Sequence, residues 1–194
     1  MREWRLETSG SVIPPFMRSI GDLEDEAVSI DTVTVSIVPG LVQSLSYARA
    51  VFRAGRPTAP DEEIERLAHL RVNRYESLIG RNNPLVTAVF PQFALDWMPE
   101  TVRKEQVSSL LRFLERDRTK IQVFPNKSLY LASVAPVQLY RLRDGASVAS
   151  SDHGDGNIVH QTPSSTARME RKDREALSMS LPVDHTVKLL REML

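Results

Sequence analysis

The pattern of hydrophobic and polar positions is clearest in residues 38–55. A turn signal, Pro39-Gly40, precedes a run in which apolar side chains recur at the spacing of one helical face. These side chains belong to Leu41, Leu45, Ala48 and Phe52, and Gly55 follows as a helix C-cap. The segment therefore predicts a buried helix that the chain enters through a fixed corner.

The segment before this corner is rich in β-branched residues. Valine and isoleucine alternate with threonine and serine between Thr32 and Val38, which favours a strand. Residues 24–31 are compatible with either a helix or a strand. A second helix is expected after Thr58, a candidate N-cap, because the acidic residues 61–63 favour the positive end of a helix dipole. Its apolar stripe consists of Ile64, Leu67, Ala68, Tyr75, Leu78 and Ile79.

One charged residue, Arg71, falls inside this apolar stripe, and Arg74 follows it one turn later. An unpaired buried charge is costly, so the guanidinium of Arg71 needs a partner or a ligand. It either pairs with a buried carboxylate or reaches solvent at the edge of the stripe, or it recognises an anion through its forked geometry. The sequence leaves both interpretations open.

The remaining elements predict an α+β fold with a small antiparallel or mixed sheet packed against several helices. Further strands are expected at 85–90, 121–124, 129–134 and 137–142, and helices at 100–115, at 164–179 and at the C-terminus, where Asp184 is the expected cap. Residues 143–165 are rich in serine, glycine and aspartate, which favours a loop or a weak edge strand. We expect an N-terminal arm over residues 1–23 and one α+β domain over residues 24–194.

Composition narrows the function classes. With 194 residues, 41% hydrophobic and 26% charged, the chain is typical of one globular domain. Cysteine is absent, which excludes disulfides, thiolate metal sites and a cysteine nucleophile. No apolar run approaches the length of a membrane span, and the first residues do not resemble a signal peptide, so a cytoplasmic location without membrane contact is expected.

Neither the net charge nor the short motifs indicate a specific binding or catalytic function. The 25 basic and 25 acidic residues balance, so no bulk positive field is available for a nucleic acid. No Gly-rich phosphate loop, paired-histidine metal motif or nucleophile elbow is present, and neither a cofactor nor a metal is expected. The catalytic candidates are Asp152, His153 and Asp155, because a histidine flanked by two carboxylates suits a general base or a metal ligand. The composition of a surface loop explains the same residues.

A family resemblance adds to this pattern. It is carried by Val38-Pro39-Gly40-Leu41, Gln43 and Tyr47-Ala48-Arg49-Ala50, followed in order by the two arginines, Val123-Phe124-Pro125 and Ala176-Leu177-Ser178. From about Glu26 onward, the chain resembles the C-terminal domain of unknown function of actinobacterial, antitoxin-like transcriptional regulators of the Xre helix-turn-helix type. The helix-turn-helix that precedes this domain in the family is not expected here, because 23 residues cannot hold one.

The resemblance implies a domain that senses a small molecule or binds a regulatory protein partner, without binding DNA by itself. The ligand-binding candidates are Arg71, Arg74, Gln92, Gln43, Tyr47 and Trp97. We expect both arginines to face one polar cavity beside Pro39-Gly40, with Gln92 in its wall. Gln92 departs from the family, which has a glutamate there, so any pairing of that position with the arginines is lost. The alternative is a divergent enzyme of small-molecule, natural-product metabolism built on the same pocket.

A homodimer is also expected. Trp4, Leu6, Phe16, Met17 and Ile20 give the N-terminal arm apolar side chains that need a cover, and exposed apolar surface is unfavourable. This arm, or the C-terminal helix with Leu190 and Leu194, is expected to contribute to the interface.

Overall fold

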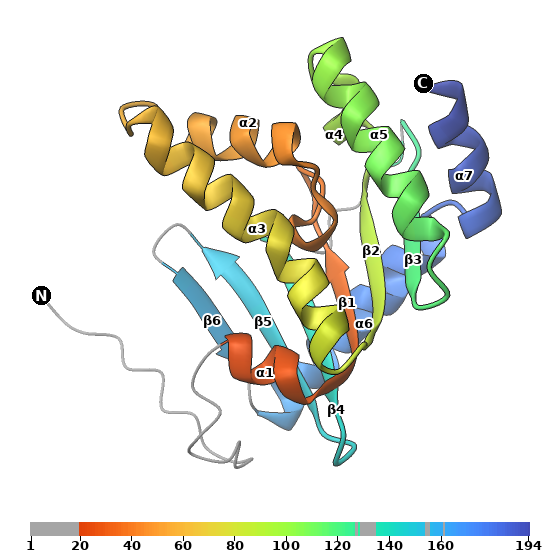
Figure 1. Cartoon of the computed structure of the whole chain (residues 1–194). Coiled ribbons are helices and arrows are strands. Elements are labelled where there is room, and N and C mark those ends of the chain that lie inside the picture. The colour runs from red at the N-terminus through yellow and green to blue at the C-terminus, as the bar shows by residue number, and fades with distance from the viewer. Residues whose placement is uncertain (1–19, 127, 129–134, 154–155, 161) are drawn as a thin grey trace, which may run out of the picture.

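The computed structural model describes residues 20–126, 128, 135–153, 156–160 and 162–194 (Figure 1). Within these residues it contains seven α-helices and one six-stranded mixed sheet, with the strand order β3-β2-β1-β4-β5-β6. This arrangement confirms the predicted α+β class, with a mixed sheet packed against helices. The predicted strand at 129–134 lies outside the described residues, as do residues 1–19 of the expected arm.

The sheet has a parallel half and an antiparallel half. β1 (Ala27–Val33), β2 (Leu85–Pro91) and β3 (Thr119–Phe124) run parallel to one another, because helical segments carry the chain back between them. β1 also pairs antiparallel with β4, and hairpin connections continue the antiparallel half. The antiparallel strands are β4 (Val137–Leu142), β5 (Ser147–His153) and β6 (Gly156–His160).

Helices cover both faces of the sheet (Figure 1). On one face, α3 packs on the strands through Tyr75 and Leu78, and α5 through Val107 and Leu110. On the opposite face, α6 packs on β1, β4 and β5. The helices are α1 (Ile20–Glu26), α2 (Leu45–Gly55), α3 (Asp61–Arg81), α4 (Phe93–Asp96), α5 (Glu100–Leu114), α6 (Pro163–Met179) and α7 (Val183–Glu192).

The Pro39-Gly40 corner leads into a 3-10 turn, η1 (Gly40–Val42), before α2 begins. Leu41 is therefore buried in the turn instead of on the helix. Ser44 is the N-cap of α2, and its hydroxyl accepts a hydrogen bond from the backbone N–H of Tyr47 at 3.3 Å. Gly55 is the last helical residue, and the C-cap is the next residue.

Two expected side-chain caps are not formed. α3 begins after Pro60 instead of at Thr58, and α7 begins after Pro182, with Asp184 in its exposed first turn. The N-cap residue of each helix is a proline, whose ring restricts φ but offers no side-chain oxygen to accept a hydrogen bond from the first turn.

The prediction of a loop or a weak edge strand over residues 143–165 was wrong for β5. β5 pairs on one side with β4 and on the other with β6, so it is an interior strand. Residues 24–31, which were compatible with a helix or a strand, contain both: α1 ends at Glu26 and β1 starts at the next residue.

The structure changes two expectations about the ends of the domain: its N-terminal boundary and the role of the C-terminal helix in a dimer. α1 crosses the expected boundary at residue 23, and Leu23 is buried in the core. Leu190 is fully buried against the α5 side of the core, so it is not available to a dimer interface, whereas Leu194 is 50% exposed. Among the helices of the described part, none is both long and apolar enough to cross a bilayer.

Candidate functional site

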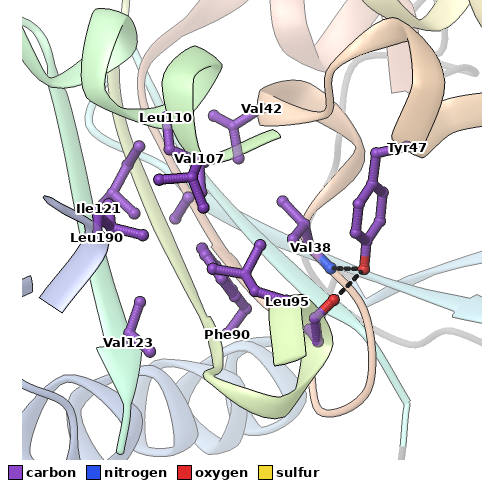
Figure 2. Close-up of a cluster of buried hydrophobic side chains, with 12 residues drawn as sticks. Val38, Val42, Tyr47, Phe90, Leu95, Val107, Leu110, Ile121, Val123 and Leu190 are labelled. Atoms are coloured by element: carbon purple, nitrogen blue, oxygen red, sulfur yellow. Dashed lines mark hydrogen bonds between the residues drawn. The ribbon is translucent and has the colours of Figure 1, made fainter. Parts of the chain in front are cut away.

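Tyr47 fixes the corner that carries the family resemblance. Its fully buried hydroxyl accepts a hydrogen bond from Val38 N–H at 3.1 Å and donates one to the carbonyl of Ala94 at 3.0 Å (Figure 2). Burial raises the pKa of this phenol, so it remains a neutral hydroxyl. Tyr47 was predicted as a ligand-binding residue, but it lies in the core and not in the lining of the cavity described below.

Two glutamines hold the backbone that follows. Gln43 is buried; its Nε2 donates to the carbonyl of Val38 at 2.7 Å. The side chain of Gln106 accepts from Ser44 N–H at 2.7 Å and donates to the carbonyl of Val42 at 2.8 Å. These bonds satisfy buried polar groups of the turn, and the bonds of Gln106 tie the turn to α5.

Arg71 lies against this corner. Its Nη1 donates to Oε1 of Gln43 at 3.3 Å, and its guanidinium carbon lies 4.2 Å from the centre of the Phe52 ring. Gly40 lies directly beside this guanidinium, since a Cβ at Gly40 would be in van der Waals contact with Nε of Arg71 at 3.7 Å. Burial lowers the pKa of Arg71, and the nearby charge of Arg74 acts in the same direction. No carboxylate of the described residues forms an ion pair with Arg71.

Arg74 differs from Arg71 in having a carboxylate partner. Its Nε and Nη2 donate to the two carboxylate oxygens of Glu24 at 3.0 Å and 2.6 Å. The side chain of Glu24 is only 3% exposed. Burial acts to lower the pKa of Arg74, but the hydrogen bond and the charge of Glu24 outweigh it and the pKa is raised. The charge of Arg74 is thus balanced within the protein, while that of Arg71 is not.

Both arginines line a cavity of about 520 Å³ beside Gly40. It lies on the α3 face of the sheet, where the parallel half meets the antiparallel half. In open α/β sheets, ligands bind outside the carboxyl ends of strands at the point where the strand order reverses. The end of β1 is such a point, because β2 and β3 lie on one side of β1 and the later strands β4 to β6 lie on the other. The lining consists of Ile20, Gly21, Glu24, Thr32, Thr34, Ile37, Gly40, Arg71, Arg74, Pro136, Gln138, Ser150 and Asp152.

Neutral polar side chains from the sheet complete this lining. The hydroxyl of Tyr140 donates to Oε1 of Gln138, and burial raises its pKa to about 12, so it stays protonated. Because Oε1 accepts this bond, the N–H donors of Gln138, which have no partner among the described residues, are available to the cavity. Thr32 and Ser150 were not singled out from the sequence. A signal in the sequence could have indicated them: polar residues two positions apart, such as Ser150 and Asp152, lie on the same face of a strand.

Gln92 and Trp97 lie elsewhere, which corrects the expectation that Gln92 is in the cavity wall. Gln92 follows β2, on the far side of β1 from the cavity strands, and its Oε1 accepts a hydrogen bond from Asn126 N–H at 3.3 Å. Trp97 is 77% exposed and stacks on Phe93 with ring centres 4.7 Å apart. Gln43 contributes indirectly, by holding Arg71.

Of the three catalytic candidates, Asp152 lines the cavity with an exposed side chain. Asp155 and the side chain of His153 lie outside the described part of the chain. Among the residues that are described, no group of three or more histidine, aspartate or glutamate side chains is placed to hold a metal ion.

The fold and the cavity define an α+β domain organised around a polar pocket with a charged wall. The family model described as a domain of unknown function, DUF5753, matches residues 17–192, and the chain belongs to this family. Neither the search of curated proteins nor the search of solved structures found a significant match.

Proposed function

We propose that this domain binds a small molecule whose anionic group is held by Arg71. The observation that carries the proposal is the burial of that guanidinium without a carboxylate partner. It is partly buried, oriented by Gln43 and Phe52, and without an ion-pair partner among the described residues. A buried cation that the protein leaves unpaired is unfavourable, and an incoming anion relieves that cost.

The surroundings of Arg71 support a prearranged site. Its orientation is fixed before a ligand arrives, which reduces the entropy lost on binding. The cavity volume of about 520 Å³ lies within the usual range for small-molecule sites. Thr32, Gln138 and Ser150 add neutral hydrogen-bonding groups beside the charged wall.

The resemblance to transcriptional regulators suggests a biological role for this ligand binding. The proposed role is that of the sensory domain of an actinobacterial, antitoxin-like regulator of the Xre type, which binds its ligand without reading DNA itself. α1 is the element best placed to report ligand binding, because Ile20, Gly21 and Glu24 line the cavity and the chain continues from α1 toward its N-terminal residues. A regulatory protein partner and a homodimer remain predictions.

A thermal-shift panel tests the binding. The wild-type protein and Arg71→Gln are heated with acetate, butyrate, benzoate, succinate or inorganic phosphate. At least one anion is expected to raise the melting temperature of the wild type and not that of Arg71→Gln, because binding to the folded state alone stabilises it. Arg168→Gln, which removes an exposed arginine of α6, is the matched control and should respond like the wild type. Equal responses of wild type and Arg71→Gln would contradict the proposal.

A further inference from the structure

The charges in the cavity wall cancel. Among the described residues, Arg71 and Arg74 supply two positive charges, and Glu24 and Asp152 supply two negative charges. Arg74 and Glu24 satisfy each other through their two hydrogen bonds. This leaves one cation and one anion, Arg71 and Asp152, without an ion-pair partner in the described part of the molecule.

These two remaining charges come from different elements. Arg71 projects from α3, and Asp152 lies near the end of β5, where its backbone N–H donates to the carbonyl of Pro136 at 3.2 Å. The charge of Asp152 acts to raise the pKa of Arg71, yet the two side chains do not form an ion pair. The cavity is therefore lined by one positive and one negative side chain that do not pair with each other.

Apart from these two residues and the paired Arg74 and Glu24, the lining of the cavity is uncharged. Ile20, Ile37 and Pro136 give apolar surface, and Thr32 and Gln138 give polar surface without charge. A ligand with one anionic group would satisfy Arg71 but would meet repulsion from Asp152, and a dianion would meet more. A ligand with an anionic and a cationic group separated by a short chain satisfies both Arg71 and Asp152.

From this arrangement we infer that the ligand is a zwitterionic amino acid, with its carboxylate on Arg71 and its ammonium group on Asp152. The inference rests on the proposed function, since it assigns the second half of a ligand whose first half is bound by Arg71. Carboxylate and guanidinium form the two parallel hydrogen bonds that a forked donor favours. The exposed side chain of Asp152 lets the ammonium group keep part of its hydration.

Calorimetric titrations with two matched series of probes test the inference. The first series is glycine, β-alanine, γ-aminobutyrate, δ-aminovalerate and ε-aminocaproate, in which the separation of the two charges grows. The second is the alkanoates from acetate to caproate, which lack the ammonium group. We expect one amino acid to bind about tenfold more tightly than its alkanoate, which corresponds to one charge-assisted contact.

Variants separate this inference from the proposed function. Asp152→Asn should remove the preference for the amino acid, and alkanoates should bind this variant at least as tightly as the wild type, because the repulsion from Asp152 is gone. Asp117→Asn removes an exposed carboxylate outside the cavity and should retain the preference. Arg71→Gln should lose both series.

Binding of alkanoates as tightly as amino acids would overturn the inference and leave the proposed function intact. A preference that survives in Asp152→Asn would also overturn it. Absence of binding in both series would overturn the inference, and failure of the anion panel as well would overturn the proposed function.

Discussion

Arg74 and Glu24 join α3 to α1 through two hydrogen bonds of 3.0 Å and 2.6 Å, and Glu24 is almost completely buried. The backbone around Glu24 is also held, because Nδ2 of Asn82 donates to its carbonyl at 2.7 Å and to that of Ala27 at 2.8 Å. This pair fixes one wall of the cavity and gives the two arginines of α3 different roles. Arg74 is structural, while Arg71 is left for a ligand.

Arg74→Gln should lower the free energy of unfolding by about 2–4 kcal/mol, because it leaves the carboxylate of Glu24 buried without its cation. The expected loss is below that of a fully buried pair because Arg74 itself is partly exposed. Urea denaturation followed by circular dichroism measures it. Arg168→Gln should stay within about 0.5 kcal/mol of the wild type, as is usual for an exposed site. Equal unfolding midpoints for wild type and Arg74→Gln would show that the pair does not stabilise the fold.

Arg71→Gln should behave differently from Arg74→Gln. Removing this guanidinium relieves the cost of a partly desolvated charge, and this gain opposes the loss of its contact with Phe52 and of its hydrogen bond to Gln43, each worth about 1 kcal/mol. The free energy of unfolding should therefore change by less than about 1 kcal/mol, while ligand binding is lost. The same denaturation experiment measures it. A loss as large as that of Arg74→Gln would indicate that Arg71 is a structural residue.

Tyr47→Phe should lower the free energy of unfolding by about 1–3 kcal/mol, because the amide of Val38 loses its buried acceptor. The carbonyl of Ala94 loses its donor at the same time. Affinity for the ligand should stay close to that of the wild type. Lost affinity without lost stability would instead restore Tyr47 to the ligand-binding residues predicted from the sequence.

A buried acid on the opposite face of the sheet predicts a pH effect. Asp173 on α6 is 3% exposed, and its Oδ1 makes no hydrogen bond within the described residues. Burial raises its pKa to about 7, and the charge of Asp31 on β1 adds to this; Arg141 and Arg174 act in the opposite direction.

Because the pKa of Asp173 is higher in the folded state than in the unfolded chain, this site favours folding most at low pH. Its contribution is lost as the pH rises from about 4 to 7. The stability of Asp173→Asn relative to the wild type should therefore increase over that interval, by at most about 4 kcal/mol. Urea denaturation of both proteins at the two ends of the interval measures it, with Asp117→Asn as control. A stability difference that does not vary with pH would contradict a raised pKa.

Much of the fold could be predicted from periodicity. The apolar stripe of α3, the short buried strand β2 and the helix α5 have the spacing of their structures, and their bounds differ from the prediction by few residues. β5 was missed because its residues are small and polar. One face of this strand, with Ser150 and Asp152, lines a cavity instead of a hydrophobic core. On its other face lies Ser151, whose Oγ is 3.0 Å from Nε2 of His160 on β6.

The candidate site was predictable in part. Arg71 stood out in the sequence because its charge interrupts an apolar stripe. The turn signal Pro39-Gly40 stood out as well, and Gly40 lies beside the guanidinium of Arg71. Which arginine is paired depends on Glu24, 50 residues earlier in the chain, and no local pattern reveals that contact. Gln92 was assigned to the cavity through the family resemblance, but the position of β2 between β1 and β3 takes it away from the cavity strands.

The central claim is that the guanidinium of Arg71 receives the anionic group of a ligand. Nuclear magnetic resonance of the arginine Nε–H groups observes it directly, with the Arg71 signal assigned by its loss in Arg71→Lys. During titration with γ-aminobutyrate, butyrate or inorganic phosphate, we predict a saturable shift of this signal with at least one probe, while the signal of Arg168 stays unchanged. An Arg71 signal that does not move with any probe, or that moves only together with Arg168, would contradict the claim.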